Sequence, residues 1–180
     1  LFPDWYVAHA LGQSFTAEQQ DWWQQTCDVL VSSALKQAKV FVHRDYMPRN
    51  LMLSEPNPGI LDFQDAVDGP ISYDITSLFK DAFISWPEAR VTAWLQEYWR
   101  KAQACELAVA DTFEEFQRDS DLMGAQRHLK VIGIFARICH RDGKPRYLND
   151  VPRFFTYLQQ VIARRAELEP LAQLLTSLSK

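Results

Sequence analysis

The sequence has few cysteines and no long hydrophobic run, which argues against a disulfide-rich protein, a thiolate metal site and a membrane-spanning protein. Its three cysteines, Cys27, Cys105 and Cys139, lie far apart and form no CxxC pair, so neither a disulfide framework nor a thiolate metal site is predicted. No apolar run approaches the roughly 18 residues of a membrane-spanning helix. The N-terminal segment LFPDWYVAHALG lacks a basic stretch followed by an apolar one, so we expect no signal peptide. A cytoplasmic location follows by default.

The sequence also lacks an excess of basic residues. Its 19 lysines and arginines are outnumbered by 23 aspartates and glutamates, which gives a net charge of −4. A nucleic-acid-binding surface is normally basic, so no nucleic acid is expected as a partner. A bound anion would need local cations or a metal ion instead. The chain does not begin with Met, and we expect it to be cut from something longer. Its composition does not indicate an oligomeric state.

Most of the 180 residues have the hydrophobic spacing of helices, so a mainly α fold of the α+β class is predicted, as one domain over residues 1–180. Thr16 is a suitable N-cap for the first helix. Helices are predicted over Thr16–Ala38, Tyr73–Ser85, Glu88–Ala110, Thr112–Arg118, Asp121–His140, Val151–Ala166 and Pro170–Leu178.

Short β-forming segments occur only near the middle of the chain. Val40–Val42 is predicted to be a strand that leads into a polar loop, His43–Asn50. Leu51–Leu53 and Ile60–Phe63 flank a segment rich in turn-forming residues around Pro56, so they predict a hairpin. Asp65–Pro70 is expected to be a further loop.

The predicted hairpin would gather polar side chains at one end. If the chain folds back near Pro56, residue pairs whose numbers sum to about 112 face each other, which brings Asn50 opposite Asp62. Asp45 lies just upstream on the loop. Asn and Asp oxygens are ligands suited to Mg²⁺ with phosphate oxygens completing its shell. Asp45 would then stay free to accept a proton from an attacking hydroxyl, as phosphoryl transfer requires.

Two neighbouring features have a structural interpretation. His43 is predicted to be a structural histidine that braces the loop. The triplet of His43, Arg44 and Asp45 recurs as residues 140–142, but there it follows a helical run and no hairpin with a second Asp comes after it. We interpret the second triplet as a helix C-terminus that runs into a turn over Gly143–Pro145.

The motif HRDYMPRN, followed by ILDFQDA and GPISYDITSLF, resembles the aminoglycoside phosphotransferase/choline kinase superfamily, which has a protein-kinase-like fold. The resemblance implies that this chain is the C-terminal lobe and that ATP and Mg²⁺ are the cofactors. It implies that Asp45 is the catalytic base, that Asn50 and Asp62 bind Mg²⁺, and that Asp74 braces the catalytic loop.

Most of the chain also resembles the bacterial anomeric kinases of cell-wall recycling, which phosphorylate the C1 hydroxyl of N-acetylmuramate and N-acetylglucosamine. The segments that carry this similarity include LFPDWYVAHALG and GIFARICHRDGKPRYLNDVPRFFTYL. The implied substrate is an amino sugar. An aminoglycoside or another small alcohol is the alternative acceptor.

Several kinase elements are missing from the sequence. None of its six glycines lies close enough to another for GxGxxG, and no V-A-I-K-like strand precedes the loop. We therefore expect the nucleotide-covering N-terminal lobe to be absent from this chain and the fragment alone to be inactive. The Gly of D-F-G and the A-P-E motif of protein kinases are also absent, which favours a small-molecule acceptor.

Candidate substrate-binding residues are polar or aromatic. Arg44 and Tyr46 flank the predicted base, Asp81 lies one helix further on, and Arg137 lies late in an otherwise apolar helix. An Arg would suit a sugar carboxylate through bidentate pairing. Trp5 and Tyr6 could stack on a sugar.

Two other classes of function stay open. A metal-dependent hydrolase could use His43, Asp45 and Asp62, although it would want more His ligands than a chain with four histidines offers nearby. A non-catalytic kinase-like binding module would have the same fold, but such proteins often lose one of the motif residues.

Overall fold

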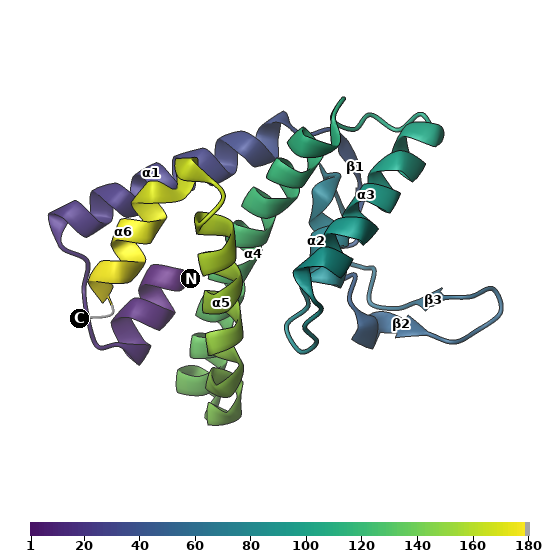
Figure 1. The fold of residues 1–180 in the computed structure, drawn as a ribbon. Coiled ribbons are helices and arrows are strands. Elements are labelled where there is room, and N and C mark those ends of the chain that lie inside the picture. The colour runs from purple at the N-terminus through teal and green to yellow at the C-terminus, as the bar shows by residue number, and fades with distance from the viewer. Residues whose placement is uncertain (179–180) are drawn as a thin grey trace. The chain divides into compact units, whose positions relative to one another are not determined.

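Helices make up most of the structure, a computed structural model that describes residues 1–178 (Figure 1). The predicted mainly helical fold with small β elements is confirmed. The α-helices are α1 (Ala17–Lys36), α2 (Ser72–Phe79), α3 (Glu88–Ala104), α4 (Phe113–Asp142), α5 (Val151–Ile162) and α6 (Glu169–Leu178). Segments with π or 3₁₀ helical geometry are η1 (Phe2–Ala10), η2 (Pro48–Asn50), η3 (Pro145–Asp150) and η4 (Ala166–Leu168).

The described chain divides into two compact units. One comprises Ser33–Gly124, and the other comprises Leu1–Ser32 together with the described residues from Ala125 onward. The unit of Ser33–Gly124, called here the loop unit, holds the β-strands, α2 and α3. The other, called here the terminal unit, holds η1, α5 and α6. The helices α1 and α4 each contribute to both units.

Two small antiparallel sheets lie in the loop unit. In one, β2 (Leu51–Met52) pairs with β3 (Gly59–Ile60), so the predicted hairpin is present, and Figure 1 shows it as a narrow projection. In the other, β1 (Lys39–Val42) pairs with β4 (Val67–Pro70). The expectation that residues 65–70 form only a loop was wrong. Val67 is the only good β-former of β4, so the pairing with β1 defines the strand and its own propensity does not.

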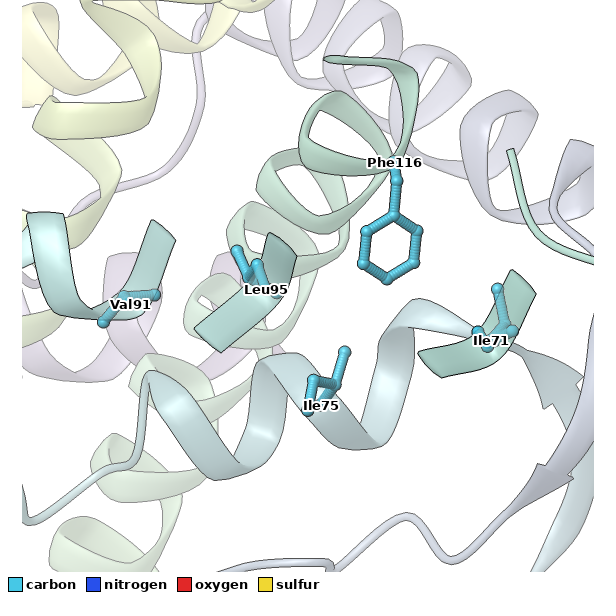
Figure 2. Close-up of a cluster of buried hydrophobic side chains, with 6 residues drawn as sticks. Ile71, Ile75, Val91, Leu95 and Phe116 are labelled. Carbon is cyan, nitrogen blue, oxygen red and sulfur yellow. The ribbon is translucent and has the colours of Figure 1, made fainter. Parts of the chain in front are cut away.

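The core of the loop unit fixes α2 in place. Apolar residues of α2, α3 and α4 point toward one another in Figure 2, and α3 presents its buried residues at the spacing of one helix face. Burial of each large apolar side chain contributes about 1.5–3 kcal/mol. The cluster thus anchors the start of α2, where Asp74 lies. Its members are Ile71, Ile75, Val91, Leu95, Ala102 and Phe116.

Helix α4 is longer than the sequence predicts. Two helices separated near Asp119 were expected, and the structure has one continuous helix from Phe113 to Asp142. The polar residues at the expected break have partners in the fold: the Ser120 hydroxyl donates to the Phe116 carbonyl, and Asp119 accepts from Ser33. The bond of Ser120 stays within α4 and that of Asp119 reaches Ser33 of α1, so neither side chain caps a helix end here.

In the terminal unit, α5 and α6 bury leucine and aromatic side chains, and η1 packs through rings. The Phe2 ring stacks on Tyr6 at 5.4 Å and on Trp23 at 5.6 Å between centroids. The start of α1 has the expected cap, because Thr16 and Gln19 exchange backbone-to-side-chain hydrogen bonds of 2.9 and 3.2 Å. No helix among residues 1–178 is long and apolar enough to cross a bilayer.

Candidate active site

A carboxylate at the start of α2 holds the loop that follows β1. The backbone N–H of His43 donates to Asp74 Oδ2 at 2.6 Å, and the backbone N–H of Arg44 donates to Asp74 Oδ1 at 3.0 Å. Hydrogen bonds to a charged group each contribute about 1.5–3 kcal/mol. Together they hold Arg44 at a φ of 74°, a conformation that a side chain with a Cβ adopts at a cost of about 1–2 kcal/mol. The role that the resemblance implied for Asp74, as a brace of a catalytic loop, stays a prediction.

The hairpin brings the polar groups together in a register slightly different from the expected one. Leu51 pairs with Ile60, so facing residues sum to 111 and not to about 112. Asn50 therefore lies opposite Leu61, whose N–H donates to the Asn50 carbonyl at 3.0 Å. The Asn50 side chain still reaches both predicted partners. Its Nδ2 donates to the Asp45 carbonyl at 2.9 Å and lies 3.5 Å from Asp62 Oδ2.

The second oxygen of Asp62 has a partner that sequence reasoning missed. Gln64 Nε2 donates to Asp62 Oδ1 at 2.8 Å, and Asp62 has a φ of 68°. This left-handed turn lets a side chain two residues later return to the carboxylate. The amide of Gln64 holds one oxygen of Asp62 and leaves the other directed at Asn50.

The Asp45 carboxylate is open in the structure. Asp45 is half-buried, and only its main-chain carbonyl takes part in the contact with Asn50. Within the described chain its carboxylate has no hydrogen-bond or ion-pair partner. A hydroxyl group of a bound molecule could therefore donate to it directly.

The side-chain oxygens of Asn50 and Asp62 fit a hard cation whose other ligands are phosphate oxygens. The Nδ2 of Asn50 is engaged, and its Oδ1 accepts no hydrogen bond from a described residue. This amide oxygen and Asp62 Oδ2 are hard ligands of the kind that Mg²⁺ accepts together with phosphate and water. Among residues 1–178, no group of three His, Cys, Asp or Glu side chains is arranged to hold a metal ion. The described residues therefore offer no cluster of metal ligands that would support the alternative of a metal-dependent hydrolase.

The His43 side chain faces an apolar cavity. It is 3% exposed, its ring lies edge-on to Tyr46 at 5.9 Å, and neither ring nitrogen has a partner among the described residues. The cavity, of about 460 Å³, is also lined by Phe41, Ile60, Phe63, Asp74 and Tyr98. The loop thus contacts α2 through the His43 backbone, whereas the His43 ring only packs.

Tyr98, another residue of the cavity wall, has a raised pKa. The cause is burial and, secondarily, the charge of Asp74.

The predicted substrate residues of the loop unit lie in different settings. Arg44 Nη1 donates to the Asp65 carbonyl at 3.3 Å, and Tyr46 packs on His43. Asp81 is 4% exposed, and its Oδ1 accepts from the backbone N–H groups of Phe83 and Ile84 at 2.8 and 3.0 Å. Asp81 therefore braces the connection after α2. Roles for these residues in substrate binding stay predictions.

The other three candidates belong to the terminal unit. Trp5 stacks on His9 at 4.8 Å, and burial raises the pKa of Tyr6. Arg137 is half-buried, and its Nε has no hydrogen-bond partner among the described residues. The substrate roles of these three residues also stay predictions.

A second contact missed by sequence reasoning joins the loop to the connection after α2. The Arg49 guanidinium carbon lies 3.4 Å from the centroid of the Phe83 ring, a cation–π contact. Only the position of Arg49 beside the motif residue Asn50 could have indicated it.

Curated relatives of known name align with almost the whole chain. It is 66% identical over 178 residues to proteins named N-acetylmuramate/N-acetylglucosamine kinase from Pseudomonas putida and Pseudomonas aeruginosa, and 54% identical to one from Neisseria meningitidis. Each alignment covers 99% of this chain but only 52–53% of the relative. The chain thus spans about half the length of the curated relatives that it matches.

Comparison with a protein-family model points to the same kind of enzyme as the named relatives. The model of the phosphotransferase enzyme family matches residues 1–117, a span that includes the loop after β1, the hairpin and Asp74. The resemblance drawn from the HRDYMPRN and ILDFQDA segments is confirmed. Because the match extends over more than half of the chain, the chain belongs to the phosphotransferase enzyme family.

Proposed function

We propose that the protein containing this chain is an ATP-dependent phosphotransferase that moves the γ-phosphate onto the C1 hydroxyl of an amino sugar. N-acetylmuramate and N-acetylglucosamine are the proposed acceptors, and a cytoplasmic location, where ATP is available, is part of the proposal. One observation carries the chemistry: the Asn50 amide contacts the Asp45 main chain at 2.9 Å and the Asp62 carboxylate at 3.5 Å. The predicted base and the two predicted metal ligands are thereby gathered at one end of the hairpin.

Each residue has a distinct role in the proposed reaction. The open carboxylate of Asp45 accepts the proton of the sugar hydroxyl as that oxygen forms a bond to the γ-phosphorus, and the bond from this phosphorus to the β-phosphate oxygen breaks, which releases ADP. Asn50 Oδ1 and Asp62 Oδ2 would hold Mg²⁺, which neutralises phosphate charge when it is bound. Asp74 fixes the loop backbone through its two hydrogen bonds, so the base keeps its position.

The part that covers the nucleotide is proposed to lie outside these 180 residues, because they contain no Gly-rich loop. The distribution of exposed apolar side chains supports this. Around the catalytic loop, Leu53 is 95% exposed and Phe41 is 72% exposed, and Ile60 and Phe63 are also exposed. A surface of this kind is rare on a monomer unless something covers it. We therefore expect the 180-residue chain alone to bind ATP poorly and to transfer no phosphate.

The choice of sugar rests on the relatives, which carry N-acetylmuramate and N-acetylglucosamine in their names. The family as a whole leaves an aminoglycoside or another small alcohol as the alternative acceptor. A non-catalytic binding module is the remaining alternative, and the intact set of Asp45, Asn50 and Asp62 argues against it.

A kinase assay separates these possibilities. The full-length protein that contains this chain would be assayed for ADP release with N-acetylmuramate, with N-acetylglucosamine and with kanamycin. We expect turnover of the two sugars and none of kanamycin. Turnover of kanamycin alone would replace the sugar assignment, and no ADP release above the acceptor-free rate would favour the binding module.

The metal ligands can be tested without turnover. Binding of Mn²⁺ to the protein with a non-hydrolysable ATP analogue would be followed by electron paramagnetic resonance. The variant Asp62→Asn should weaken Mn²⁺ binding at least about tenfold, because it removes the charged ligand. Unchanged Mn²⁺ binding would contradict the assignment of Asp62.

A further inference from the structure

We propose that Arg49 recognises the carboxylate of N-acetylmuramate and thereby favours this sugar over N-acetylglucosamine. The inference rests on the proposed function and deepens it. The two sugars share the ring and the C1 hydroxyl, and N-acetylmuramate adds a lactyl ether that ends in a carboxylate. A group that contacts this carboxylate affects the phosphorylation of one sugar and not of the other.

The position of Arg49 is the first argument. It belongs to η2 and immediately precedes Asn50, whose side chain joins Asp45 to Asp62. The contacts of Asn50 hold the backbone beside Arg49 at the proposed catalytic site, so the proposal places the group bound by Arg49 near the acceptor sugar.

The state of its guanidinium is the second argument. One face of the guanidinium lies on the Phe83 ring, with 3.4 Å from Arg49 Cζ to the ring centroid. Arg49 has no hydrogen bond or ion pair with any described residue, and it is exposed. Stacking orients the plane of the guanidinium but leaves its N–H groups, which point outward in that plane, available. This is the geometry in which Arg binds a carboxylate through two parallel hydrogen bonds.

Phe83, whose ring orients Arg49, has its backbone held by a buried carboxylate. The backbone N–H of Phe83 donates to the buried Asp81 carboxylate at 2.8 Å. The neighbouring Lys80, also buried, pairs with Glu88 at 3.6 Å and with Asp121 at 3.9 Å. The backbone that carries the Phe83 ring is therefore connected through Asp81 and Lys80 to α3 and α4.

Local charge is the third argument. Residues 41–70 contain five acidic side chains and only two basic ones, Arg44 and Arg49. An anionic sugar entering this segment would be repelled unless a cation faced it. Arg44 already donates to the Asp65 carbonyl at 3.3 Å. Of these two cations, Arg49 is thus the one whose donors remain for a ligand.

The test compares the two sugars in the full-length protein that contains this chain. The variant Arg49→Met keeps the length of the stem and removes the charge. We expect kcat/KM for N-acetylmuramate to fall about 10- to 100-fold, as the loss of a charged hydrogen bond predicts, and kcat/KM for N-acetylglucosamine to change less than about twofold. Retained turnover of N-acetylglucosamine would also show that the variant is folded.

Three further variants sharpen the comparison. Arg49→Lys keeps the charge without the planar fork and should lose an intermediate part of the preference for N-acetylmuramate. Phe83→Leu removes the ring and should reduce the same preference by a smaller factor. Arg146→Met is the matched control, because the Arg146 guanidinium carbon also lies near a ring, 5.4 Å from the Tyr147 centroid. This variant should leave kcat/KM unchanged for both sugars.

Two outcomes would overturn the inference. One is unchanged kcat/KM for N-acetylmuramate in Arg49→Met. The other is an equal loss for both sugars with a raised KM for ATP, which would make Arg49 a phosphate contact. If the unaltered protein turned over neither sugar, the proposed function itself would fail, and that result is distinguishable from the other two.

Discussion

The tripeptide of His, Arg and Asp occurs twice in this chain and has a different structure at each place. Residues 43–45 follow β1 and enter a loop, whereas residues 140–142 are the last turn of α4. The same three side chains therefore have no fixed role, and their surroundings decide what they do.

In the first copy, the neighbours are long-range. Asp74, about 30 residues away in sequence, accepts both backbone N–H groups of His43 and Arg44. The hairpin then returns Asp62 to the loop through Asn50. The Asp45 carboxylate stays without a partner among the described residues, so it remains available for a ligand.

In the second copy, the neighbours are local. Arg141 Nε donates to Asp142 Oδ1 at 2.6 Å, and its Nη2 donates to Oδ2 at 3.1 Å. The aspartate is thus occupied by its own arginine on an exposed helix end. Gly143 follows with a φ of 66° and ends the helix in the left-handed conformation. This copy terminates a helix, as its sequence context predicts.

The largest expected difference between the copies is catalytic. Asp45→Asn in the full-length protein should lower kcat about 10²- to 10⁴-fold, because it removes the proposed proton acceptor. Asp142→Asn, the matched change in the second copy, should leave kcat within about twofold. Steady-state ADP release measures both variants, and circular dichroism checks that each is folded. Full activity of Asp45→Asn would disprove the assignment of the base.

The next difference concerns stability. Asp74→Ala removes two hydrogen bonds to a charged acceptor and should lower the free energy of unfolding by about 2–4 kcal/mol. Urea denaturation followed by tryptophan fluorescence measures it. Arg141→Ala, which breaks only the exposed pair of the second copy, should leave the denaturation midpoint unchanged. Equal effects of the two changes would remove the distinction between a clamped loop and a helix end.

A smaller effect is expected at the residue that follows the second copy. Gly143→Ala places a Cβ in the left-handed region and should destabilise the protein by about 1 kcal/mol, although nothing within 4 Å would collide with it. The same denaturation experiment detects this change. A stabilised variant would show that the helix end can relax into another conformation.

The smallest effect is a titration shift. The hydrogen bond from Arg141 lowers the pKa of Asp142, and Lys144 and Arg137 add to this through their charges. Arg141→Ala should therefore raise the pKa of Asp142 toward the ordinary value of an aspartate. Carbon-13 NMR of the carboxyl resonance against pH measures it. An unshifted titration in the variant would mean that Arg141 and Asp142 are not paired in solution.

The sequence predicted features that depend on neighbouring residues. The cap of α1 by Thr16 is confirmed, and the second triplet ends a helix as expected. The turn-rich segment around Pro56 predicted the hairpin because two short apolar segments flank it. In each case the physical cause lies within a few residues of the chain, so periodicity and turn chemistry were sufficient.

Features that depend on distant partners were missed. Strand β4 exists because β1 pairs with it, and α4 continues through Asp119 because Ser33 satisfies that side chain. The shift of the hairpin register by one residue was also beyond the sequence, since residue spacing fixes the turn only approximately. The contacts of Gln64 with Asp62 and of Arg49 with Phe83 belong to the same group.

The sequence by itself thus determined the helical class, the hairpin, the chemical identity of the three site residues and the family that they indicate. Only the tertiary structure decided which atoms of Asp74 hold the first triplet, which oxygens stay open and where Arg49 is directed. The physical reason is that hydrogen bonds to Asp74 and packing on Phe83 arise between segments that only the fold brings into contact.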